Sequence, residues 1–153
     1  MSNSSMQKIV VLCDFSERMP EVIVHGVRMA DVLKKELCLT SFWRKMDERP
    51  PLQEKLYQTS RNLKAAFPGI DVSWLLLQKS LADNMQKLVD EFEAVLCVLH
   101  QTDSQWAMRA FRQSSIAFLF VKGEIPRFLS YKNVLVPIDF RKASKDTSLW
   151  ASY

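Results

Sequence analysis

The 153-residue sequence predicts a doubly wound α/β fold of the Rossmann-like kind, in which helices cover both faces of a mainly parallel sheet. Two observations carry this prediction. Short apolar runs alternate with amphipathic helical segments along most of the chain. These runs are apolar throughout, as expected for strands that are buried on both faces. The length and a hydrophobic content of 48% allow one sizeable core, and therefore one main domain.

Strands and helices alternate from the first half of the chain onward. In chain order, the expected elements are a strand at Lys8–Cys13, a helix from Pro20 to about Lys35, a strand at Leu37–Phe42, a charged loop at 44–51, and a helix through Leu52, Leu56, Leu63 and Phe67. Pro20 suits the first turn of a helix because that turn needs no N–H donor. Pro68 and Gly69 end the second helix.

The second half continues the alternation. Its expected elements are a strand through Ile70, Val72, Trp74 and Leu76, a helix through Leu81, Met85, Leu88 and Phe92, a strand at Ala94–Leu99, a short helix at Ser104–Arg112, and a strand at Ile116–Val121. Ser80 and Asp83 resemble a capping box at the start of the third helix. Right-handed crossovers between successive parallel strands make the fold doubly wound.

Several classes of protein are excluded by the sequence. No apolar stretch approaches the roughly 18 residues of a membrane span, and the polar opening MSNSSMQK is no secretory signal, so we expect a cytoplasmic protein without a membrane partner. Cys13, Cys38 and Cys97 lie in apolar runs without metal-binding spacing. We expect buried, reduced core thiols; the alternative, a reactive thiol, has no neighbouring cation to activate it.

The net charge of +4 is concentrated late in the chain. Between residues 109 and 132, Glu124 is opposed by five cations: Arg109, Arg112, Lys122, Arg127 and Lys132. This stretch is either a phosphate or nucleic-acid patch or a solvated face. We favour the solvated face, with no specific nucleic-acid partner, because no nucleic-acid motif accompanies the charges.

Three segments together resemble the universal stress proteins: KIVVLCDFSER at 8–18, VRMADVLKKEL at 27–37 and EFEAVLCVL at 91–99. The resemblance extends from Lys8 to about Lys122. It implies five parallel strands in the order 3-2-1-4-5. It also implies a cytoplasmic stress-response protein that forms homodimers, in a family of which some members bind ATP and others do not.

A second copy of the opening motif stands near the end of the chain. NVLVPIDF at 133–140 repeats the pattern of KIVVLCDFS at 8–16, and many universal stress proteins carry two units in tandem. We therefore interpret residues 1–125 as one α/β domain and residues 126–153 as a linker followed by the truncated start of a second unit. The chain then resembles the first unit of a tandem protein.

Candidate site residues lie where strands 1 and 4 end. Ligands of open α/β sheets bind beyond the carboxyl ends of the strands, at the switch point. The resemblance implies that Asp14 faces the nucleoside of a bound nucleotide; the structural interpretation, which we favour, is that Asp14 caps its own turn. His100 ends strand 4, where it is either an acid/base partner of Asp14 or, as we favour, an ordinary loop residue.

The phosphate half of such a site is missing from the sequence. The resemblance implies that ATP-binding members carry a glycine-rich loop after strand 4, but the chain has only Gly26, Gly69 and Gly123. The 16 residues 100–115 hold a helix or that loop, not both. We therefore expect a non-catalytic interaction protein with a degenerate nucleotide site and no cofactor. The alternative is an ATP- or AMP-binding protein with a remodelled site, formed by Asp14, Ser16, His100 and Arg109.

The implied strand order places Ile116–Val121 at a sheet edge. This strand carries no internal charge or proline to block pairing, so we expect a homodimer through it. Asn133–Ile138 would expose an apolar strand unless it pairs on its own sheet or on a neighbouring subunit. We expect it to contribute to the same contact.

Overall fold

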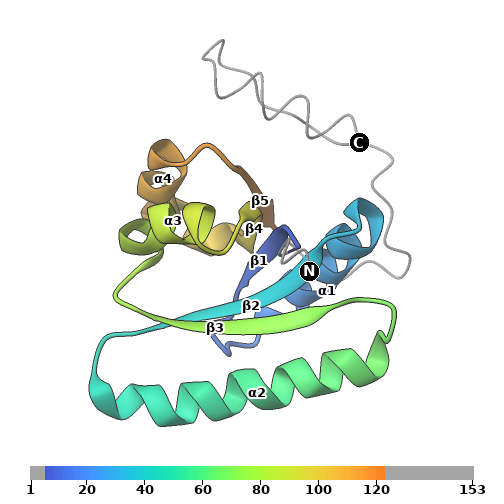
Figure 1. Cartoon of the computed structure of the whole chain (residues 1–153). Helices are drawn as coiled ribbons and strands as arrows, with labels where there is room; N and C mark the ends of the chain where they lie inside the picture. The colour runs from blue at the N-terminus through green and yellow to red at the C-terminus, as the bar shows by residue number, and fades with distance from the viewer. Residues whose placement is uncertain (1–5, 123–153) are drawn as a thin grey trace.

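Five parallel strands form one sheet with helices on both faces (Figure 1). The computed structural model describes residues 6–122. The strand order is β3-β2-β1-β4-β5, which confirms the doubly wound fold and the order that the resemblance implied. The strands are β1 (Lys8–Leu12), β2 (Glu36–Trp43), β3 (Val72–Gln78), β4 (Ala94–His100) and β5 (Ala117–Val121). The helices are α1 (Met19–Leu33), α2 (Arg49–Ala66), α3 (Leu81–Asp90) and α4 (Ser104–Gln113), with short 3-10 helices η1 (Met46–Glu48) and η2 (Gln101–Asp103).

Each face of the sheet has its own core. Alternate residues of a strand point to opposite faces. In β1, Ile9 and Val11 join the core beneath α1 and α2, whereas Val10 joins the core beneath α3 and α4. All three are at most 1% exposed. Burial on both sides explains why the strand sequences are apolar throughout.

Helix α1 lies unusually close to the centre of the sheet. A Cβ atom added at Gly26 would stand 2.4 Å from Val11 Cγ2 and 3.2 Å from Leu37 Cδ1. Glycine is a poor helix former, and its place inside α1 is explained by this close approach. Gly26 therefore fixes the depth at which α1 packs on β1 and β2.

The three cysteines are buried, as predicted. Cys13 lies just after β1, Cys38 in β2 and Cys97 in β4. Burial raises the pKa of the Cys13 thiol to about 12 and raises the pKa of the Cys38 and Cys97 thiols as well. Because the thiolate is the reactive form, these are structural thiols.

The predicted start of the third helix is confirmed. Ser80 is the N-cap of α3: its Oγ accepts a hydrogen bond from the Asp83 N–H at 3.3 Å. The same hydroxyl donates to the Asp83 carboxylate at 2.6 Å. This hydrogen bond from Ser80, with help from nearby cations, lowers the pKa of Asp83.

The prediction of a charged loop at residues 44–51 is wrong for most of that segment. Met46–Glu48 form η1, and α2 begins at Arg49 with Pro50 and Pro51 in its first turn. Prolines fit there because first-turn N–H groups have no acceptor within the helix. The Glu48 carboxylate accepts hydrogen bonds from the N–H groups of Arg44 and Lys45, at 2.8 and 3.1 Å, and so fixes the entry into η1.

The other element boundaries differ from prediction by one or two residues. Ile116 precedes β5 and Ile70 precedes β3, while Phe92 follows α3. The predicted linker and second unit, residues 126–153, lie outside the described residues, and so does the proposed pairing segment Asn133–Ile138. Within residues 6–122, no helix is both long and apolar enough to cross a membrane.

Candidate functional site

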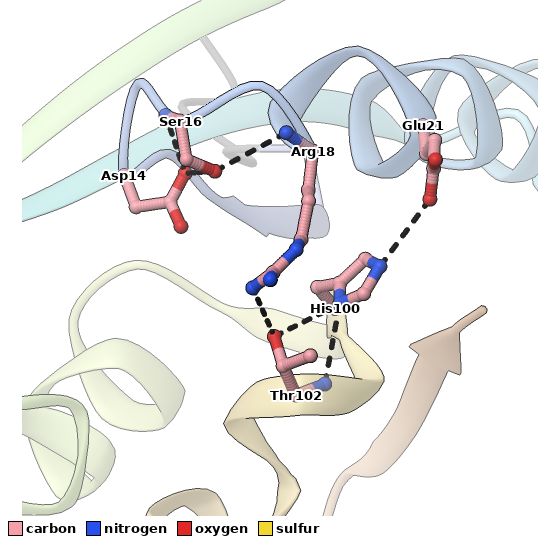
Figure 2. Close-up of polar contacts among 6 residues, drawn as sticks. All are labelled: Asp14, Ser16, Arg18, Glu21, His100 and Thr102. Atoms are coloured by element: carbon pink, nitrogen blue, oxygen red, sulfur yellow. Dashed lines mark hydrogen bonds and ion pairs between the residues drawn. The ribbon is translucent and has the colours of Figure 1, made fainter. Parts of the chain in front are cut away.

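The carboxyl ends of β1 and β4 lie side by side and lead in opposite directions. β1 continues into α1 and then β2 on one side, whereas β4 continues into α4 and then β5 on the other. This is the switch point of the sheet, where ligands of open α/β folds bind. The turn at Asp14 lies on one side of the switch point, and the segment from His100 to Thr102 lies on the other (Figure 2).

Asp14 organises the turn that follows β1. Its Oδ1 accepts hydrogen bonds from the Ser16 N–H at 2.9 Å and from the Ser16 hydroxyl at 2.8 Å. Ser16 Oγ in turn accepts from the Arg18 N–H at 3.3 Å. This is the turn-capping role that we favoured for Asp14 from the sequence. Asp14 and Ser16 are both exposed, so they line the surface of the switch point.

Phe15, between them, has a left-handed backbone with φ of 57°. A bulky residue rarely adopts this conformation, and the strain is of order 1 kcal/mol. Packing compensates for it, because the ring rests against the core beneath α1 and α2. The Lys55 ammonium of α2 lies 5.5 Å from the ring centroid, within the range of a cation–π contact.

The polar contacts of the His100 ring run to Thr102 and Glu21 rather than to Asp14. Nδ1 lies 3.2 Å from the Thr102 backbone N and 2.9 Å from its Oγ1. Nε2 lies 3.3 Å from Glu21 Oε2, in the first turn of α1. His100 is therefore not merely a loop residue, because it joins β4 to α1.

Arg109, the fourth predicted site residue, belongs to another part of the molecule. It lies in α4, on the side of the sheet that α3 also covers, and its charge contributes to lowering the pKa of Asp83. The cation at the switch point is Arg18 instead: its Nη1 donates to Thr102 Oγ1 at 3.1 Å. The structure thus brings Asp14, Ser16 and His100 to the two strand ends, whereas Arg109 comes from within helix α4.

Sequence reasoning missed Arg18, Glu21 and Thr102. Arg18 carried a usable signal, because it stands four residues after Asp14 in the connection that follows β1. Glu21 and Thr102 carried none. A glutamate in the first turn of a helix is common, since its negative charge interacts favourably with the helix dipole. A threonine in a polar loop is equally common.

The connection from β4 to β5 is filled by helix. Its residues form η2 at Gln101–Asp103 and α4 at Ser104–Gln113, and residues 70–122 contain no glycine. Ala107 and Ala110 of α4 are fully buried in the core shared with α3. This helix occupies the span in which a glycine-rich phosphate loop would have to lie.

A hollow of about 320 Å³ opens elsewhere on the molecule. It is lined by Arg44, Gln78, Lys79, Ser80 and Asp83, near the ends of β2 and β3. The side chains that line it carry charges of both signs. The Asp83 carboxylate already accepts a hydrogen bond from Ser80 at the start of α3. Among residues 6–122, no group of three metal-ligating side chains could hold an ion.

Comparison with known proteins identifies the architecture. A universal stress protein from Archaeoglobus fulgidus superposes with a TM-score of 0.64 at 17% sequence identity, over 77% of this chain and 95% of that one. The Archaeoglobus fulgidus protein in complex with dAMP gives 0.63 at 16% identity, over 76% and 98%. A universal stress protein in complex with cAMP gives 0.57 at 22% identity, over 78% and 98%.

This chain has the universal stress protein fold. No protein-family model matches the sequence, and no curated protein matches it either. The likeness therefore rests on structure, and it covers nearly the whole length of each relative. The bound dAMP and cAMP are ligands of those proteins.

Proposed function

We propose that this chain belongs to the universal stress protein family and acts in the cytoplasm without catalysis, through homodimerisation and protein interaction. The observation that carries the proposal is the helical connection from β4 to β5. Backbone N–H groups cradle phosphates only where the chain approaches them closely, which requires glycine or a free helix terminus. Here the connection contains no glycine, the Thr102 N–H is bonded to His100 Nδ1, and the Ser104 N–H is bonded to the Gln101 carbonyl.

Charges around the switch point also disfavour a polyphosphate. The carboxylates of Asp14, Glu21 and Asp103 come from the β1–α1 connection, the first turn of α1 and η2. Against them stands the Arg18 guanidinium, which already donates to Thr102. A flexible, exposed cation holds a phosphate far less specifically than a preformed cradle. We therefore expect the nucleotide site to be degenerate.

Calorimetric titration tests this directly. ATP, ADP, AMP and dAMP are titrated into the full chain, with the Archaeoglobus fulgidus protein and dAMP as the positive control. We expect no saturable heat below about 1 mM ligand, which corresponds to a binding free energy weaker than about 4 kcal/mol. A Kd in the low micromolar range for any of these nucleotides would contradict the proposal.

The competing function is nucleotide binding through a remodelled site, in which ATP or AMP would meet Asp14, Ser16, His100 and Arg109. Two relatives with this fold were solved with dAMP and cAMP, which favours this candidate. A mononucleotide depends less on a phosphate cradle than ATP does. If binding is found, Asp14→Ala should abolish it, and Arg109→Ala tests whether Arg109, whose charge also acts on Asp83, belongs to that site.

A further inference from the structure

Strand β3 is an outer strand of the sheet, and its edge lacks the features that block pairing with another strand. Its seven residues, VSWLLLQ, include neither a charged residue nor proline. β5, the other outer strand, has five residues. A long apolar edge of this kind is a template for a further strand.

The hydrogen bonds to β2 define which backbone groups of β3 point outward. The Asp71 carbonyl accepts from the Leu37 N–H at 2.8 Å, and the Lys79 N–H donates to the Trp43 carbonyl at 2.9 Å. Asp71 and Lys79 therefore turn their backbone groups toward β2, and so does every second residue between them. The residues that alternate with these point outward, and within residues 6–122 three of them have no backbone partner. They are Val72, Trp74 and Leu76.

Apolar side chains lie on both sides of this edge. Helix α2 packs on β2 and β3, whereas α3 packs on α4 and β4 (Figure 1). Lys55 of α2 reaches Phe15, which follows the central strand β1, and Tyr57 lies about 200° further round the helix. Tyr57 therefore lies on the outer flank of α2, where it is 44% exposed. On the other face of β3, Leu75 is only partly buried.

The hollow of about 320 Å³ opens at the carboxyl end of β3. Arg44 and Lys79, which line it, are exposed, and neither side chain forms a hydrogen bond or ion pair with the rest of the described chain. The Asp83 carboxylate, by contrast, already accepts a hydrogen bond. The Gln78 carbonyl accepts from Asn84 Nδ2 at 2.7 Å, so the open edge ends here. A carboxylate in the hollow would give the two cations a partner.

A second copy of this chain does not fit the β3 edge. The two edges lie at opposite ends of one sheet, so pairing through both would join copies into an open series without closure. This exclusion rests on the proposed function, in which the homodimer uses β5. A short peptide adds one strand and joins no further copy. If it runs parallel to β3, as the other strands do, its carboxyl terminus reaches the hollow.

We propose that the β3 edge and the hollow bind the free carboxyl terminus of an extended apolar peptide. The peptide adds to the sheet as a sixth strand, parallel to β3, and its main chain pairs with the outward groups of Val72, Trp74 and Leu76. Arg44 and Lys79 bind its terminal carboxylate, which fixes the register of the added strand.

The test is an NMR titration of the ¹⁵N-labelled full chain with a hexapeptide of alternating threonine and valine. The peptide is made with a free carboxyl terminus and with a carboxamide. We expect the free acid to shift the amides of Val72, Trp74 and Leu76 with a Kd below about 1 mM. The amide should bind about tenfold more weakly, because it loses charge-assisted hydrogen bonds.

Matched variants locate the site. Arg44→Gln and Lys79→Gln change exposed side chains, and each should weaken binding of the free acid while leaving the amide unchanged. Leu119→Lys, in β5, should leave the binding of both peptides unchanged, so the result does not depend on whether the homodimer forms.

Two N-methylated peptides test strand pairing itself. One is methylated on the nitrogens of its three threonines and the other on those of its three valines. Because alternate N–H groups of a strand point in opposite directions and the carboxylate fixes the register, one of the two should lose binding and the other should keep it. Equal binding by these two peptides overturns the proposal, and so does equal binding by the free acid and the amide.

Other occupants give different results, and each of these also overturns the proposal. If acetylvaline binds as tightly as the hexapeptide, the hollow is a simple anion site. If Leu76→Lys reduces the mass of the oligomer in light scattering, a second copy occupies the edge. If the free acid shifts no amide of β3 at about 1 mM, the edge accepts no such strand.

Discussion

Gly26 lies in α1 directly above β1, and the 2.4 Å between an added Cβ and Val11 Cγ2 leaves no room for a side chain. Gly26→Ala gains helix propensity of about 1 kcal/mol, but overpacking of a tight core costs about 1–3 kcal/mol. The clash involves a buried, β-branched neighbour that cannot swing away. We therefore expect a net loss of up to about 2 kcal/mol in the free energy of unfolding, measured by urea denaturation.

Gly69 provides the matched control for this change. Nothing lies within 4 Å of a Cβ added there, so Gly69→Ala should change the free energy of unfolding by less than about 0.5 kcal/mol. If both substitutions destabilised the protein equally, the close approach of α1 to β1 would not explain why position 26 is glycine.

The candidate site was only partly predictable from single residues. Asp14 could be placed because it directly follows an apolar run that must end at the carboxyl edge of a parallel sheet. The partner of His100 could not, because Glu21 reaches it from a helix 79 residues away in the chain. Arg109 was assigned to the site from its charge, but it lies within α4, and its charge acts on Asp83 at the start of α3. Side-chain direction on a short helix depends on packing that the sequence does not reveal.

Local side-chain contacts determine where the helices begin, and the sequence revealed these contacts for some helices but not for others. At α3, Ser80 and Asp83 gave a readable signal and the structure confirmed it. At α2, two adjacent prolines suggested a loop, although prolines are well tolerated in a first helical turn. The decisive contact, from the Glu48 carboxylate to the Arg44 and Lys45 N–H groups, spans a 3-10 turn that the pattern of apolar residues does not show.

The cap of α3 makes a prediction at the scale of the element. Ser80→Ala removes the acceptor of the Asp83 N–H and should lower the free energy of unfolding by about 1 kcal/mol. Ser80→Thr keeps a hydroxyl at the N-cap and should lose much less. Chemical denaturation followed by circular dichroism measures both variants. If Ser80→Thr were as unstable as Ser80→Ala, the hydroxyl would not be the group that stabilises the helix start.

The whole sheet was the most predictable feature of the molecule. Five runs that are apolar on both sides, separated by helices, allow few arrangements once right-handed crossovers are required. The order of the strands came from the resemblance, and the structure bears it out. That order leaves β3 and β5 as the two outer strands of the described sheet, so it also defines where a second copy could extend it.

The homodimer that we propose uses the β5 edge, and the β3 edge supplies the comparison. Leu119 of β5 and Leu76 of β3 are both partly buried leucines on outer strands, and both pack against the core beneath α1 and α2. A lysine in an edge strand opposes pairing with another chain. Leu119→Lys and Leu76→Lys should disturb the monomer to a similar degree, because their surroundings are alike.

We expect light scattering at about 100 μM, well above the Kd of a stable interface, to give a dimer for the wild type and Leu76→Lys and a monomer for Leu119→Lys. Circular dichroism verifies that both variants remain folded. A monomeric wild-type chain, or a dimer that survives Leu119→Lys but not Leu76→Lys, would place the contact somewhere other than β5.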